Sequence, residues 1–144
     1  MPMRTAQAIW KGTLKDGKGT MSIGRDGKEF EYSYPSRFES GNGTNPEEML
    51  GAAHAGCFSM ALSLFVAEAG FTPGSIRTVA RVHLDKSDEG FSITRIELDT
   101  TADVPGMDPK AFQTQADKAK ANCPVSRALA GVEITLRAKL EKNA

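Results

Sequence analysis

The stretch GTNPEEMLGAAHAGCFSMALSLFVAEAG, residues 43–70, decides how this sequence is expected to fold. It begins with Asn45 and Pro46, which are typical of a helix N-cap and of the first helical position. The two glutamates that follow favour the positive end of the helix dipole, and Gly70 is a typical helix stop. The sequence therefore predicts one continuous helix, about 37 Å long at 1.5 Å per residue.

This predicted helix has almost no polar face between Leu50 and Ala67. A helix that is apolar on all sides is expected to be buried on all sides. Its many alanines, glycines and serines would let another helix approach closely. A chain of 144 residues can hardly surround so long a helix alone. We therefore expect a homodimer, in which a partner subunit helps to cover the helix.

The composition points to one domain over residues 1–144. The 18 basic and 18 acidic residues cancel, so no bulk charge favours a nucleic-acid or membrane partner. The first ten residues hold no run apolar enough for a signal peptide, and polar residues interrupt the long apolar stretch. These are His54, Ser59, Ser63 and Glu68. We therefore expect a cytoplasmic protein that does not span a membrane, in a compartment where stable disulfides are rare.

Shorter elements flank the long helix on both sides. Asp16-Gly17 and Asp26-Gly27 are hairpin turn signals. The predicted elements before the long helix are strands at 19–23 and 29–34 and an irregular loop at 35–42. Those after it are strands at 77–85 and 91–103, helices at 108–122 and 124–129, and a final strand at 132–140. This order of strands, long helix, strands, helices and strand indicates an α+β fold.

The two cysteines lie far apart in the sequence, and neither belongs to a CxxC motif. Cys123 directly precedes Pro124, so it is predicted at a helix N-terminus, where the pKa of a thiol is lowered. Cys57 lies about three turns inside the long helix, where burial raises the pKa of a thiol. Position alone favours Cys123 as the more reactive thiol. Taken by itself, Cys57 is interpreted as a small core residue, whereas for Cys123 a structural and a reactive role are equally favoured.

A zinc site is the main alternative use of these residues. His54 and Cys57 share a helix face, and His83 and Cys123 could complete four ligands. None of the usual paired ligand spacings is present. The favoured interpretation is a hydrogen-bonded core histidine for His54 and a solvated strand residue for His83. The sequence has no phosphate-binding loop and no serine in a nucleophile-elbow context.

Three segments carry a resemblance to a known family: RFESGNGTNPEEMLGAAHAGCFSMAL at 37–62, GFTP at 70–73 and KANCPVSRAL at 120–129. They resemble the osmotically inducible protein C (OsmC) family of peroxide-detoxifying enzymes, whose relatives are the organic hydroperoxide resistance (Ohr) proteins. The likeness extends across nearly the whole chain, and the histidine before Cys57 favours OsmC over Ohr. It implies N-terminal antiparallel strands, a long buried central helix, a second set of strands with helices, and an intertwined homodimer.

The resemblance also implies a stress-defence thiol peroxidase that reduces organic hydroperoxides and, less efficiently, hydrogen peroxide. Cys57 would be the peroxidatic cysteine and Cys123 the resolving one, with Arg37 and Glu47 as the charged pair of the active site. An external dithiol, typically a lipoyl group, would recycle the disulfide, and no cofactor or metal is expected. An apolar hydroperoxide substrate would explain why Cys57 lies in an apolar helix. The candidate walls of its pocket are Phe38, Met49, Phe58 and Met60.

Two expectations about geometry follow. Because a disulfide needs Cα atoms roughly 4.4 to 6.8 Å apart, Cys57 and Cys123 should lie close together. The resemblance implies that both belong to one chain, since the family's bridge is intramolecular. Glu47 and Cys57 are ten residues apart on one helix, or about 15 Å along its axis, which is too far for them to share a site. We therefore expect Glu47, with Arg37, to serve Cys57 of the partner subunit. A stress protein that only binds hydrophobic ligands is the remaining alternative to an enzyme.

Overall fold

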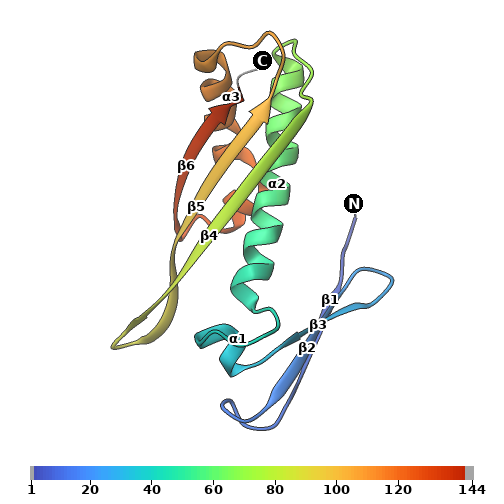
Figure 1. Ribbon diagram of the computed structural model, residues 1–144, viewed down its shortest axis with the longest axis vertical. Coiled ribbons are helices and arrows are strands. Elements are labelled where there is room, and N and C mark those ends of the chain that lie inside the picture. Colours follow the sequence, from blue (N-terminus) through green and yellow to red (C-terminus); the bar gives the residue numbers. More distant parts are fainter. Residues whose placement is uncertain (1, 142–144) are drawn as a thin grey trace. The chain divides into compact units, whose positions relative to one another are not determined.

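The computed structural model describes residues 2–141, which form two compact units, one up to Met49 and one from Leu50 onward (Figure 1). Each unit has a three-stranded sheet of its own. The long helix α2 (Pro46–Glu68) begins in the first unit and continues into the second. The predicted α+β class is confirmed, and a single domain over residues 1–144 stays a prediction.

The sheet of the first unit is an antiparallel meander. Its strands, in spatial order, are β1 (Ala6–Lys11), β2 (Lys18–Ile23) and β3 (Lys28–Tyr32). Both hairpin turns occur where the sequence predicts them. Gly24 and Gly27, with φ of 75° and 62°, supply the left-handed conformations that the second turn needs. The predicted strands at 19–23 and 29–34 correspond to β2 and β3, and β3 ends two residues earlier than predicted.

The predicted loop at 35–42 is wrong at its beginning, because Tyr34–Phe38 forms the short helix α1. Ser33 and Ser36 form a reciprocal capping box. Ser33 N donates to Ser36 Oγ at 2.8 Å, and Ser36 N donates to Ser33 Oγ at 3.3 Å. Pro35 suits the first turn because its missing N–H needs no partner there. The usual residue at position N3 of this motif is Glu or Gln, so Ser36 in its place gives no recognisable helix signal in the sequence.

Helix α2 begins and ends as its sequence predicts. Asn45 Oδ1 accepts a hydrogen bond of 2.8 Å from Glu48 N, which is the N-cap contact. At the other end Gly70 has φ of 94°, and the N–H groups of Gly70 and Phe71 donate to carbonyls of the last turn. These two bonds are the pattern of a Schellman C-cap. Both ends are therefore fixed by local chemistry.

The partner subunit that was expected to help cover α2 stays a prediction, and one chain alone covers only one face of this helix. Its buried side chains His54, Phe58, Leu62 and Val66 recur every four residues, and the last three belong to the core of the second unit. Met60 and Leu64 on the other face are 77% and 55% exposed. One sheet can cover only one face of a helix. Helix α2 is long and apolar enough to span a membrane, but the core helix of a folded domain can have the same length and composition.

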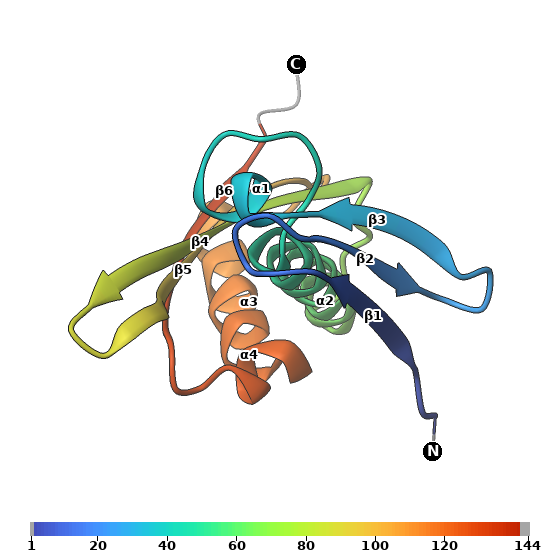
Figure 2. The ribbon, with the colours of Figure 1, turned by 90° about the horizontal axis from the view of Figure 1, so that it is seen from below.

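The second unit packs helices on one face of a mixed sheet (Figure 2). Its strands, in spatial order, are β4 (Ser75–Ser87), β5 (Gly90–Asp103) and β6 (Glu133–Leu140). Strands β4 and β5 are antiparallel, and β6 runs parallel to β5. The helices that follow β5 are α3 (Pro109–Asn122) and α4 (Pro124–Ala128). All the elements predicted after the long helix are thus confirmed.

Candidate active site

The two cysteines meet in the second unit although 66 positions separate them. Their Sγ atoms lie 3.0 Å apart in one chain, and both thiols are free. Cys57 comes from the middle of α2, and Cys123 lies at the junction where α3 ends and α4 begins. The prediction that the two lie close together is confirmed. Since a disulfide bond is roughly 2.05 Å long, only a small approach of the two sulfurs separates this pair from a covalent bridge.

The two thiols differ in acidity. Burial raises the pKa of the Cys57 thiol above its ordinary value, and the neighbouring Cys123 adds to this rise. Burial also opposes ionisation of Cys123, but hydrogen bonds from Cys57 and from the amide and hydroxyl of Ser126 outweigh it and lower the pKa of Cys123. Ser126 N donates to Cys123 Sγ at 3.4 Å. Cys123 therefore loses its proton first, which agrees with the interpretation from its sequence position.

A buried histidine lies behind the thiol pair. His54 is 0% exposed, and its Nε2 lies 2.7 Å from Ser126 Oγ. Burial lowers the pKa of His54, so its imidazole is neutral at neutral pH. The other ring nitrogen, Nδ1, has no hydrogen-bond partner within residues 2–141. Sequence reasoning missed Ser126, although it lies inside the CPVS segment that carries the family resemblance.

The four-ligand zinc site is wrong. In the part of the chain that the structure describes, no three His, Cys, Asp or Glu side chains are placed to hold a metal ion. His83 instead pairs with Glu97 Oε1 at 3.1 Å on the sheet, and Arg95 binds the same oxygen at 2.9 Å.

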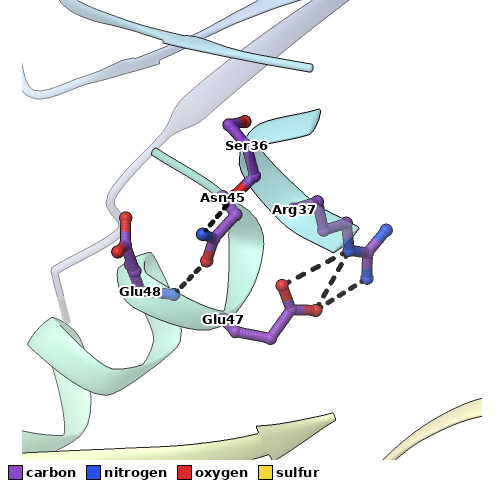
Figure 3. A network of polar contacts seen from close by, with 5 residues as sticks. All are labelled: Ser36, Arg37, Asn45, Glu47 and Glu48. Carbon is purple, nitrogen blue, oxygen red and sulfur yellow. Dashed lines mark hydrogen bonds and ion pairs between the residues drawn. The ribbon is translucent and has the colours of Figure 1, made fainter. Parts of the chain in front are cut away.

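The first unit contains the predicted charged pair (Figure 3). Arg37 comes from α1 and Glu47 from the first turn of α2. Arg37 Nη2 donates to Glu47 Oε1 at 2.8 Å, and Arg37 Nε lies 3.1 and 3.3 Å from the two carboxylate oxygens. The Glu47 side chain is only 9% exposed, whereas that of Arg37 is 35% exposed. The guanidinium is therefore held by a nearly buried carboxylate and still has one side open.

Asn45 fixes the geometry of this ion pair (Figure 3). Its Nδ2 donates to the carbonyl of Ser36 in α1 at 2.9 Å, while its Oδ1 caps α2. Ser36 Oγ donates back to the carbonyl of Thr44 at 2.6 Å. One amide side chain thus ties the end of α1 to the start of α2. This bond keeps Arg37 within reach of Glu47.

The four candidate pocket residues lie in different surroundings. Phe38 and Arg37 line a cavity of about 400 Å³ in the first unit, together with Trp10, Tyr32 and Tyr34. Met49 is half-buried. Phe58 is 0% exposed in the core of the second unit, whereas Met60 is exposed on the opposite face of α2. Within one chain Phe58 and Met60 therefore do not share a wall, and aromatic residues of β1 and β3 join Phe38 instead.

Comparison of the sequence with known proteins shows the family of this chain. The family model described as OsmC-like protein matches residues 39–137, a range that holds Glu47 and both cysteines. The chain belongs to the OsmC family. Peroxiredoxin OsmC of Escherichia coli strain K12 is 53% identical over 140 residues, which is 96% of each chain.

More distant relatives agree on the family and on the fold. The organic hydroperoxide resistance protein of Xanthomonas axonopodis pv. citri is 38% identical over 98 residues, 67% of each chain. An OsmC-like protein of Vibrio cholerae shares the fold with a TM-score of 0.76, over 96% of this chain and 99% of that one, at 18% identity. The family resemblance and the OsmC-like fold predicted from the sequence are both confirmed.

Proposed function

We propose that this protein is a cysteine-based peroxidase that reduces organic hydroperoxides to alcohols through Cys57 and Cys123. The observation that carries the proposal is the pair of free thiols with sulfurs 3.0 Å apart. Membership of a family whose members are named peroxiredoxin OsmC and organic hydroperoxide resistance protein supports a peroxidase-type stress function.

The first chemical step assigns the peroxidatic role to Cys57. Its thiolate attacks the distal oxygen of the hydroperoxide, the O–O bond breaks, and the alkoxide leaves and takes a proton to become the alcohol. Cys57 is left as a sulfenic acid. Access supports this choice over Cys123, because Cys57 is half-buried whereas Cys123 is 0% exposed. Acidity alone would favour Cys123, but a peroxide has to reach the sulfur that it oxidises.

The second step forms the disulfide, and the third removes it. Cys123 attacks the sulfenyl sulfur of Cys57, the S–O bond breaks, and hydroxide leaves and is protonated to water. An external dithiol then exchanges with the Cys57–Cys123 bridge and restores both thiols. A lipoyl dithiol is the reductant class that we propose, and the cytoplasm, where such thiols stay reduced, is the location that we propose.

A cation is needed to make Cys57 nucleophilic, because burial raises the pKa of its thiol. A guanidinium next to a thiolate stabilises the charged form and can also polarise the peroxide. We assign this role to Arg37, acting on Cys57 of the partner subunit, and its bidentate pairing with Glu47 fixes its orientation. The aromatic cavity beside Arg37 and Phe38 supports an apolar substrate, since its walls favour an alkyl chain.

Peroxide consumption tests the proposed function directly. With dihydrolipoamide as reductant, the purified protein should consume cumene hydroperoxide faster than hydrogen peroxide, because only the organic substrate gains from apolar walls. The rate is measured as loss of peroxide against a protein-free control. Absence of consumption with every dithiol tested would favour the alternative of a stress protein that binds hydrophobic ligands without catalysis.

The state of the oxidised protein gives a second prediction. Because both sulfurs belong to one chain, one equivalent of hydroperoxide should remove both free thiols without linking two chains. A non-reducing gel should show a band at the size of the single chain, and thiol titration should show the loss of two thiols per chain. A covalent dimer that disappears in Cys123→Ser would contradict the intramolecular bridge.

A further inference from the structure

A series of buried polar groups connects His54 through Ser126 to the two thiols. The chemistry proposed above assigns no role to His54 or Ser126. His54 Nε2 lies 2.7 Å from Ser126 Oγ, Ser126 N lies 3.4 Å from Cys123 Sγ, and Cys123 Sγ lies 3.0 Å from Cys57 Sγ. His54 and Ser126 are 0% and 5% exposed. Because burying polar side chains in an apolar core is costly, a pair placed under a reactive thiol needs an explanation.

The unpartnered nitrogen of His54 indicates the direction of these hydrogen bonds. If Ser126 donated to Nε2, the proton of the neutral imidazole would lie on Nδ1, where it would be a buried donor with no acceptor within residues 2–141. If Nε2–H donates to Ser126 Oγ, Nδ1 keeps only an unused lone pair, which is the better tolerated defect. In the second arrangement the hydroxyl proton of Ser126 is free to point at Cys123.

We propose that His54 and Ser126 are positioning residues that favour the thiolate form of Cys123 and direct it at Cys57, and that they thereby set the rate of disulfide formation. This inference rests on the proposed function, because it concerns the second step of that reaction. In that step Cys123 supplies the electron pair of the new S–S bond, the S–O bond of Cys57 sulfenic acid breaks, and hydroxide leaves and is protonated by solvent. The lowered pKa of Cys123, to which both the amide and the hydroxyl of Ser126 contribute, supports the arrangement.

Two residues of the same chain offer matched controls. His83 is the other histidine of the sequence. It pairs with Glu97 on the sheet and does not belong to the series of contacts from His54 to the thiols. Ser59 lies on α2 two residues after Cys57, but its hydroxyl bonds to Thr78 Oγ1 at 2.7 Å. His83→Leu and Ser59→Ala therefore remove the same groups as His54→Leu and Ser126→Ala, without touching Cys123.

The experiment measures the two oxidation steps separately after mixing with one equivalent of cumene hydroperoxide. Sulfenic acid at Cys57 is followed by dimedone trapping and mass spectrometry, and disulfide formation by loss of free thiols. His54→Leu and Ser126→Ala should leave the first step unchanged and slow the second about tenfold or more, as expected when a hydrogen bond to a charged group is lost. His54→Gln should restore the second step, because its amide N–H can donate to Ser126.

A spectroscopic readout makes the test independent of turnover. In the Cys57→Ser background the thiolate absorbance near 240 nm reports Cys123 alone, and the pH at which it appears should rise in His54→Leu and in Ser126→Ala but not in the two controls. Because the two residues act in series, the double variant should be no slower than the slower single variant. Circular dichroism checks folding, and Ser126→Ala, which deletes one oxygen, carries the test if His54→Leu does not fold.

The outcomes separate the two proposals. Three results would contradict the positioning role of His54 and Ser126. These are equal slowing of both oxidation steps, an unchanged thiolate absorbance of Cys123, and the same effect from His83→Leu. If the unmodified protein forms no sulfenic acid at Cys57, the proposed function fails, and the thiolate absorbance alone then decides whether His54 and Ser126 control Cys123.

Discussion

Cys57→Ser is expected to abolish peroxide turnover, whereas Cys123→Ser should still reduce one equivalent of hydroperoxide. A serine hydroxyl is almost wholly protonated at neutral pH and is a far weaker nucleophile than a thiolate, so the first step disappears with Cys57. Without Cys123 the sulfenic acid forms but has no partner in its own chain. It then remains open to further oxidation to the sulfinic and sulfonic acids.

Mass spectrometry of the peroxide-treated variants checks this division of labour. Cys123→Ser should carry added oxygens on Cys57, and their number should grow with the excess of peroxide. Cys57→Ser should leave Cys123 unmodified at the same dose, because Cys123 is 0% exposed. If Cys57→Ser stays active while Cys123→Ser does not, the roles are reversed, and the lower pKa of Cys123 is the better guide to the peroxidatic residue.

We propose that the protein forms a homodimer in which Glu47 serves Cys57 of the partner subunit. A mixture of the two inactive variants Glu47→Ala and Cys57→Ser should then regain activity when they are unfolded and refolded together. Both residues belong to α2, and ten positions on a helix are about 15 Å along its axis, which a glutamate side chain cannot span. Two α2 helices packed antiparallel about a two-fold axis would bring the start of one to the middle of the other. The exposed small residues Ala52, Ala53 and Gly56 would allow that approach.

The expected recovery follows from symmetry. In random mixing half of the dimers are mixed, and in each of these one site collects both defects while the other is intact, so about a quarter of full activity should return. Cys57→Ser mixed with Cys123→Ser is the matched control. Their sulfurs meet within one chain, so every mixed site keeps one defect and that mixture should stay inactive. Persistent inactivity of the first mixture would mean that Glu47 acts within its own chain.

Much of the fold could be predicted because its signals are local. Asn45 and Gly70 mark the ends of α2 through hydrogen bonds that involve only the neighbouring turns. The two long strands of the second unit, β4 and β5, are recognisable because apolar and polar residues alternate along them. Helix α1 escaped prediction since its capping box uses Ser36 where glutamate or glutamine is usual. The sequence indicated that one chain cannot cover α2, but apolar residues on all sides do not say which face the chain itself covers.

The candidate site was predictable in part. The approach of Cys57 to Cys123 came from the family resemblance alone, because no local pattern relates residues so distant in sequence. The pairing of Arg37 with Glu47 came from the same source. The hydrogen bond between His54 and Ser126 could not be foreseen, since it joins the long helix to the first turn of a five-residue helix and depends on tertiary packing.

Cys123 is both the C-cap of α3 and the N-cap of α4, so oxidation of its sulfur would affect how firmly the first turn of α4 is held. Its N–H donates to Ala119 O at 2.9 Å and closes α3, while its sulfur accepts from Ser126 N and caps α4. A disulfide sulfur bears no negative charge and accepts hydrogen bonds weakly, so oxidation removes part of what holds the first turn of α4. Fraying of this turn costs less in the oxidised protein than in the reduced one. In the proposed reaction cycle, the Cys57–Cys123 disulfide would thus be easier for a bulky reductant to reach at the step in which it is reduced.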